Sequence, residues 1–129
     1  MADVKKNYFT TGQMRNALIQ IEDQLVHSGW MPDIILGINR GGCIPGVYLS
    51  HRIKRPHEVI DIRLRDHTAK PNINVLEKAY AFQKKILILD DINDTGETFK
   101  YIEDNFGKGD GRIKFAALIN NKPSRLPWI

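Results

Sequence analysis

Cysteine and long apolar runs are scarce in this sequence. Cys43 is its one cysteine, which excludes an internal disulfide and leaves too few thiolates for a structural zinc site. Its position directly after two glycines indicates a small residue at a loop-to-helix turn rather than a nucleophile. No apolar run approaches membrane-spanning length, and residues 1–7 form no apolar signal region. We therefore expect a cytoplasmic protein that does not bind membranes.

Two common ligand-binding motifs are also absent. No Walker-type phosphate loop occurs, and the histidines lack H-E-x-x-H or similar spacing, so we interpret them as surface or half-buried residues. The formal charge of +4 suits an anionic ligand and would also suit nucleic acid. The densest basic stretch, residues 51–57, is interpreted as the solvated carboxyl end of a helix, where cations are favourable. An RNA-binding patch is the less favoured alternative.

Apolar strands alternate with helical patterns along the chain, whose 129 residues suit one domain, residues 1–129. Its 42% hydrophobic and 26% charged residues are typical of a folded protein rather than a disordered one. Apolar residues recur at helical spacing from 14 to 25, with Thr11 as the expected N-cap and Gly29 as the stop. Further helices are predicted at 44–53 and 97–106, and strands at 33–38, 59–64, 85–90 and 113–119. This alternation predicts a parallel sheet with right-handed crossovers.

Polar residues gather where the predicted strands end, which is where ligands bind in such sheets. Asp90 and Asp91 follow an apolar strand and can accept hydrogen bonds from vicinal ribose hydroxyls. Residues 95–98 read Thr-Gly-Glu-Thr and open a helix, whose unpaired backbone N–H groups, with the hydroxyls of Thr95 and Thr98, can surround a phosphate. The acidic pair Asp90 and Asp91 could instead only cap a helix or face solvent.

Another polar turn follows the first predicted strand. Arg40 precedes Gly41 and Gly42, so a cation lies beside backbone N–H groups that can approach a diphosphate. Residues 65–83 are mostly polar, and a long polar insertion in a compact domain usually has a use or is mobile.

The order of strand, acidic pair and Thr-Gly-x-Thr turn resembles the phosphoribosyl diphosphate (PRPP) signature of the type I phosphoribosyltransferases. Residues 117–123 resemble the bacterial xanthine-guanine enzymes. The resemblance implies an α/β fold with a parallel sheet and flanking helices, and a hood that is truncated or minimal. It also implies transfer of the phosphoribosyl group from PRPP to a 6-oxopurine (guanine, xanthine or hypoxanthine) in purine salvage, by a homo-oligomer, a dimer or a tetramer.

The resemblance also implies roles around the ribose and its phosphates. Asp90 and Asp91 would hold the ribose and share Mg²⁺ with the diphosphate. Residues Asp94, Thr95, Gly96, Glu97 and Thr98 would bind the 5′-phosphate, and Arg40, Gly41 and Gly42 the diphosphate. Family members often carry a cis peptide in the diphosphate loop, here at Asn39–Arg40. Residues 65–83 match the family's lid, which excludes water from the reacting sugar.

At the base, Asp94 would contact N7 and accept its proton, although the alternative role of this side chain is a helix N-cap. Lys122 would donate to the exocyclic O6, since a lysine donor prefers an oxo group to an amino group. The chain departs from the family pattern at Asn93, normally aliphatic, and after Lys122, where enzymes of the family continue into a hood with an aromatic ring. Here Trp128 is the one aromatic residue after Lys122.

Three explanations of the short ending stay open: a fragment, a minimal enzyme that stacks Trp128 on the base, or a protein that binds PRPP or nucleotide without transfer. The main alternative to the enzyme is a non-catalytic regulator on the same fold that binds nucleotide, and RNA through residues 51–57. A plain nucleotide-binding subunit of a larger complex is the third candidate.

Overall fold

The computed structural model describes residues 10–39, 41–62, 73–93, 96–106 and 111–120. The helices in these ranges are α2 (Thr11–Ser28), α3 (Cys43–Ile53), α4 (Asn74–Ala81) and α5 (Glu97–Asn105), and the strands are β1 (Ile34–Ile38), β2 (His57–Ile60), β3 (Ile86–Asn93) and β4 (Ile113–Asn120). None of these helices is long and apolar enough to span a bilayer.

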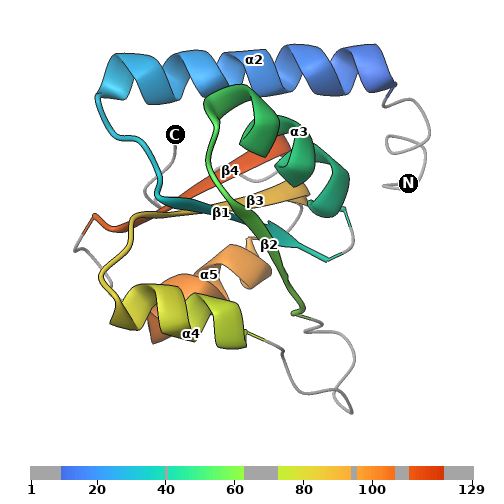
Figure 1. Ribbon diagram of the computed structural model, residues 1–129. Helices are drawn as coiled ribbons and strands as arrows, with labels where there is room; N and C mark the ends of the chain where they lie inside the picture. Colours follow the sequence, from blue (N-terminus) through green and yellow to red (C-terminus); the bar gives the residue numbers. More distant parts are fainter. Residues whose placement is uncertain (1–9, 40, 63–72, 94–95, 107–110, 121–129) are drawn as a thin grey trace.

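The four strands form one sheet in the order β2-β1-β3-β4, and every neighbouring pair is parallel. Helices α2 and α3 cover one face of the sheet, and α4 and α5 cover the other (Figure 1). Parallel strands with both faces covered are buried on both sides, which explains the unbroken apolar runs in β1 and β3. The predicted parallel sheet with flanking helices is confirmed.

Strand β3 divides its side chains between two cores. Ile86 and Ile88 pack with Phe99 and other buried residues on the side of α4 and α5. Leu87 and Leu89 pack on the opposite side, with residues of α2 and α3. All four of these strand residues are fully buried, and each such side chain stabilises the fold by about 1.5–3 kcal/mol. The sheet end that follows is therefore held rigidly on both faces.

The first helix begins and ends close to its predicted limits. Its N-cap is Thr10 rather than Thr11: the Thr10 hydroxyl accepts from the Gln13 backbone N–H at 3.1 Å, and the Gln13 side chain accepts from the Thr10 N–H at 2.8 Å. This reciprocal capping box needs a Gln three residues after the cap, which Thr10 has. Gly29 ends the helix in the left-handed conformation, with φ at 73°, as predicted.

The predicted lid, residues 65–83, is wrong over its second half. Residues 63–72 lie outside the described ranges, but Asn74–Ala81 is helix α4. Leu76 and Ala79 are buried in the core beside Ile60 and Ile62. The apolar residues of this stretch recur at helical spacing, so they form a face that packs on the sheet. Strand β2 also differs, since it begins at His57, earlier than the predicted residue 59.

Candidate functional site

The acidic pair lies at a step in the sheet edge. Strand β1 pairs with β3 only as far as Gly37 with Leu89, whereas β4 follows β3 as far as Asn93. Strand β3 therefore extends beyond its predicted end at residue 90 and includes Asp90 and Asp91. At Asp90 the strand pairs with Ala117 of β4, whereas its pairing with β1 ends one residue earlier, at Leu89. On the side toward β1, Gly41 lies against Asp91.

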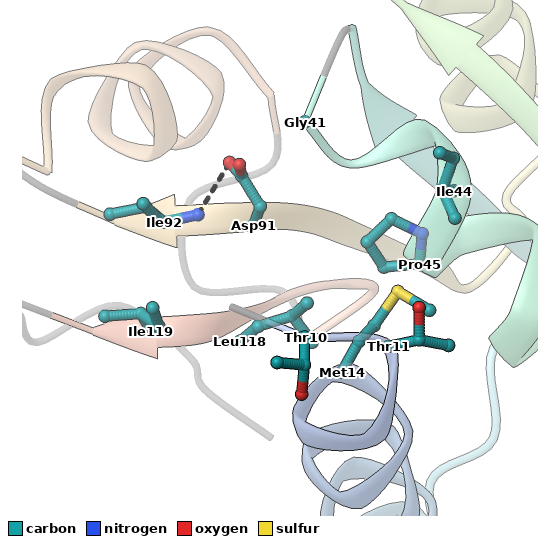
Figure 2. A pocket seen from close by; sticks show the side chains of 10 residues that line it. All are labelled: Thr10, Thr11, Met14, Gly41, Ile44, Pro45, Asp91, Ile92, Leu118 and Ile119. Carbon is teal, nitrogen blue, oxygen red and sulfur yellow. Dashed lines mark hydrogen bonds between the residues drawn. The ribbon is translucent and has the colours of Figure 1, made fainter. Parts of the chain in front are cut away.

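Both carboxylates are half-buried and held by the backbone. Asp90 Oδ1 accepts from the Asp91 N–H at 2.8 Å, and Asp91 Oδ1 accepts from the Ile92 N–H at 2.8 Å (Figure 2). Because side chains alternate along a strand, Asp91 points to the same face as Leu89, toward α2 and α3, and Asp90 points to the other. The backbone thus fixes the orientation of each carboxylate at the end of β3.

Gly41 lies directly against Asp91. A Cβ atom built on Gly41 would be 2.3 Å from Asp91 Oδ1 and 2.4 Å from Asp91 Oδ2. Gly42 is equally close to the strands, since its Cβ would be 2.2 Å from the Leu89 carbonyl oxygen. The Gly42 N–H donates to the Ile38 carbonyl at 2.8 Å, which closes the turn. The two glycines therefore bring the loop backbone against the acidic strand, while Arg40 and the Asn39–Arg40 peptide lie outside the described residues.

Helix α5 starts a short distance after the acidic pair. Its N-cap is Gly96, with φ at 83° and no side-chain hydrogen bond to the helix start. The amino-terminal N–H groups of a helix lack partners inside it, so this end can bind an anion. Glu97 is exposed and Thr98 half-buried in the first turn. Asp94 and Thr95 lie outside the described residues, and the alternative role of Asp94 as the N-cap is wrong because Gly96 fills it.

A pocket of about 290 Å³ opens beside Asp91. Figure 2 shows the ends of β3 and β4 on one side of it and the first turns of α2 and α3 on the other. The lining is mostly apolar: Thr10, Thr11, Met14, Gly41, Ile44, Pro45, Asp91, Ile92, Leu118 and Ile119. The sequence did not predict this pocket, although Ile44, two residues after Gly42, is an apolar side chain that is 66% exposed. Lys122 and Trp128, predicted to bind the base, lie outside the described residues, beyond the end of β4.

Cys43 is a structural residue at the start of α3. Burial raises the pKa of its thiol, and the nearby carboxylates of Asp61 and Asp90 raise it further. The Sγ atom donates to Asn39 Oδ1 at 3.5 Å. A thiol with a raised pKa is a poor nucleophile, so the interpretation as a small turn residue holds.

The basic stretch 51–57 is used largely within the fold. His51 and Arg52 occupy the last turn of α3, which confirms the predicted helix end. Arg52 Nε is 2.7 Å from Glu22 Oε1, and Arg55 Nε donates to the Pro32 carbonyl at 2.9 Å. His57 is half-buried at the start of β2, in agreement with the interpretation of the histidines as surface or half-buried residues.

Over the described ranges, no three His, Cys, Asp or Glu side chains are grouped as a metal site would require. The two carboxylates at the end of β3 could therefore hold a divalent cation only together with oxygen atoms from a ligand or water.

Comparison with known proteins places these features in one family. Residues 5–129 match the family described as phosphoribosyl transferase domain. A purine phosphoribosyltransferase from Pyrococcus horikoshii is 29% identical, with 92% of this chain and 81% of that one covered and a TM-score of 0.67. The xanthine-guanine-hypoxanthine phosphoribosyltransferase from Helicobacter pylori is 16% identical, with 93% of this chain and 82% of that one covered and a TM-score of 0.62. A hypothetical protein from Neisseria gonorrhoeae with bound ppGpp is 17% identical, with 92% of this chain and 77% of that one covered and a TM-score of 0.70.

The two more distant structures share the fold alone with this chain. The family match covers nearly all of the sequence, and it agrees with an acidic pair and a glycine loop brought together at the end of a parallel sheet. The chain therefore belongs to the phosphoribosyltransferase family and has its type I fold.

Proposed function

We propose that this protein transfers the phosphoribosyl group from PRPP to a 6-oxopurine, which gives the nucleoside monophosphate and diphosphate. The observation that carries the proposal is the contact between Gly41 and Asp91, whose atoms approach so closely that no side chain fits between them. The contact brings a loop suited to a diphosphate beside a carboxylate suited to a ribose. PRPP carries both groups on one sugar.

The ribose would lie over the end of β3. Asp90 and Asp91 each have one carboxylate oxygen held by a backbone N–H, and carboxylate oxygens accept hydrogen bonds from hydroxyls. Because their side chains leave β3 on opposite faces, a ribose that spans the strand end can reach both. The 5′-phosphate would lie at the amino terminus of α5, against the backbone of Gly96 and the side chain of Thr98, with Asp94, Thr95 and Glu97 completing this loop.

The purine would occupy the apolar pocket beside Asp91. Its lining by Ile92, Leu118 and Ile119 suits a flat ring, and its edge at β4 leads toward Lys122 and Trp128 along the chain. Lys122 would donate to O6 of the base, and Trp128 would stack on its ring. The preference for a purine is supported by the 29% identity with the purine phosphoribosyltransferase from Pyrococcus horikoshii.

In the reaction, the N9 lone pair of the purine forms a bond to C1′ of the ribose as the bond from C1′ to the diphosphate oxygen breaks. The diphosphate leaves with that electron pair, and Asp94 takes the proton that the purine loses through N7. Positive charge develops on the ribose ring, and the carboxylates of Asp90 and Asp91 stabilise it. Arg40, with the amides at Gly41 and Gly42, holds the leaving diphosphate.

Mg²⁺ fits this donor set, because it prefers carboxylate oxygens and two carboxylates stand at the place where PRPP would bring its own oxygen atoms. When bound, Mg²⁺ would neutralise charge on the diphosphate. Asp90 and Asp91 are the residues that would hold it, directly or through water.

A spectrophotometric assay with PRPP, Mg²⁺ and guanine, xanthine or hypoxanthine tests this proposal. We expect turnover that needs all three components, with adenine as a poor substrate. Asp91→Asn should abolish most of this turnover, and Asp104→Asn, an exposed carboxylate on α5, should keep it. Tight nucleotide binding by the wild-type protein without turnover for any base would favour the non-catalytic regulator instead.

A further inference from the structure

His57 fills a slot between two glycines. It is the first residue of β2, and its ring lies on the α3 side of the sheet. A Cβ built on Gly46 of α3 would be 2.3 Å from His57 Nε2 and 2.5 Å from Cδ2. A Cβ built on Gly37 of β1 would be 2.7 Å from the same Nε2 atom. Any side chain at either glycine would push the ring away, so the fold makes room for this imidazole specifically.

The Nε2 atom at the end of this slot is buried and has no hydrogen-bond partner among the described residues. Buried polar atoms in folded proteins are almost always paired, and each exception needs an explanation. A candidate partner is close. The point 2.7 Å from Nε2, where Gly37 would carry a Cβ, is also 2.5 Å from the Gly42 carbonyl oxygen.

The Gly42 carbonyl can take a second hydrogen bond. It already accepts from the Gly46 N–H at 2.9 Å, and a carbonyl oxygen has two lone pairs. This carbonyl shares its planar peptide with the N–H of Cys43, which points the opposite way. Cys43 is the first residue of α3, so its N–H is one of the unpaired groups at the helix start, next to the glycine loop.

From this geometry we infer that His57 is a positioning residue whose Nε2–H donates to the Gly42 carbonyl and thereby aims the Cys43 N–H at the bound diphosphate. The inference rests on the proposed function, because it takes the loop at residues 39–42 as the diphosphate site. The bond is not made among the described residues, so the inference requires that diphosphate binding brings the Gly42 carbonyl to Nε2.

The charge state of the ring suits this role. Burial lowers the pKa of His57, and the carboxylate of Glu58 opposes the shift only in part, so the ring is neutral near neutral pH. A neutral imidazole has one N–H and one bare nitrogen. The Gly42 carbonyl, an acceptor, selects the form with hydrogen on Nε2. The thiol of Cys43, on the facing helix, is neutral as well because its pKa is raised.

Two substitutions of similar size separate positioning from packing. His57→Leu removes the donor and keeps an apolar side chain in the slot, while His57→Gln keeps an N–H donor at about the reach of Nε2. His51→Leu, an exposed histidine on α3, is the matched control. The measurements are KM for PRPP, the affinity for inorganic diphosphate with Mg²⁺, and the affinity for the nucleoside monophosphate, which lacks the diphosphate.

For His57→Leu we expect KM for PRPP to rise, and diphosphate affinity to fall, by about threefold to tenfold, the effect of one hydrogen bond. Affinity for the monophosphate should stay within about twofold, and His57→Gln should restore most of the loss. Equal losses for PRPP and monophosphate, or a Leu variant that binds PRPP like the wild type, would overturn the positioning role.

The tautomer gives a test that does not depend on turnover. In nitrogen-15 spectra of the wild-type protein we expect His57 to carry its hydrogen on Nε2, with a shift of that signal when diphosphate and Mg²⁺ are added. Hydrogen on Nδ1 instead would overturn the inference, because Nε2 could then donate nothing. If the wild-type protein binds no PRPP, the proposed function fails, and the tautomer still decides whether His57 can donate to Gly42.

Discussion

Gly41 leaves no space between its own α carbon and the carboxylate of Asp91. The Cβ of any other residue at position 41 would be 2.3 Å from Asp91 Cγ, which is far inside van der Waals contact. Asp91 is held in place by the Ile92 N–H, so a larger residue at 41 must break that bond or move the loop. The glycine and the carboxylate thus depend on each other, although they follow different strands, β1 and β3.

Gly41→Ala should reduce kcat/KM for PRPP by at least about tenfold, because it displaces the Asp91 carboxylate and a hydrogen bond to a charged group is worth about 1.5–3 kcal/mol. The fold should survive, since Asp91 can rotate toward solvent. Steady-state kinetics together with a thermal unfolding scan would measure both effects. Gly12→Ala is the control, because its Cβ would meet nothing nearer than Thr10 Oγ1 at 3.8 Å. A Gly41→Ala enzyme with wild-type kinetics would show that Asp91 does not need this orientation.

Asp94→Asn should lower turnover by about 10²–10⁴-fold, the usual worth of a general base, because the amide keeps the size of the side chain and removes its basicity. PRPP affinity should change much less, since the 5′-phosphate loop keeps its backbone groups. Single-turnover kinetics and equilibrium PRPP binding would separate the two quantities. Unchanged turnover near neutral pH would remove Asp94 from the proton transfer.

Lys122→Ala should weaken guanine and hypoxanthine binding and leave PRPP affinity nearly unchanged. The lost hydrogen bond from a charged donor is worth about 1.5–3 kcal/mol, so KM for these bases should rise by at least about tenfold. Lys114→Ala, on β4 before the site, is the matched control. Equal losses for PRPP and for the bases would place Lys122 outside the base site.

The main helices and strands, and the strand that leads into the acidic pair, could be predicted from sequence because their signals are local. Apolar runs mark β1 and β3, and Gly29 marks the end of α2. The limit of β3 could not be predicted from its own residues, because Asp90 and Asp91 look like the end of a strand. The hydrogen bonds of β4 carry the strand on to Asn93, and these depend on a segment distant in sequence.

The same reason explains what was missed in the candidate site. The acidic pair and the glycine loop were both predicted, but the contact between Gly41 and Asp91 depends on how β1 and β3 align. The apolar pocket combines residues from α2, α3, β3 and β4, and most of its lining residues belong to no motif. The N-cap could have been assigned correctly, since Gln13 lies three residues after Thr10 and completes a capping box.

Leu76→Ala should destabilise the protein by about 2–5 kcal/mol, because Leu76 is fully buried in the core on the α4 side of the sheet. Lys78→Ala, an exposed position on the same helix, should change stability by less than about 0.5 kcal/mol. Chemical denaturation of both variants gives the comparison. Equal, small effects would mean that α4 is a mobile lid after all, as the sequence had suggested for residues 65–83.

The buried ring of His57 should make stability depend on pH in a defined direction. Its pKa in the folded protein is lowered, so as the pH falls the unfolded chain binds the proton first, near its ordinary value of about 6.5. The contribution of His57 to stability is therefore complete above about pH 6.5 and is lost progressively as the pH falls below that value.

Urea unfolding at about pH 7.5 and at about pH 5.5 measures this loss. The free energy of unfolding should fall more between the two pH values for the wild type than for His57→Leu, which has no imidazole to protonate at this position. The control His51→Leu, whose ring is exposed, should follow the wild type. A His57→Leu protein that loses as much stability as the wild type over this interval would show that the ring titrates alike in both states, and that the slot between Gly37 and Gly46 does not keep it neutral.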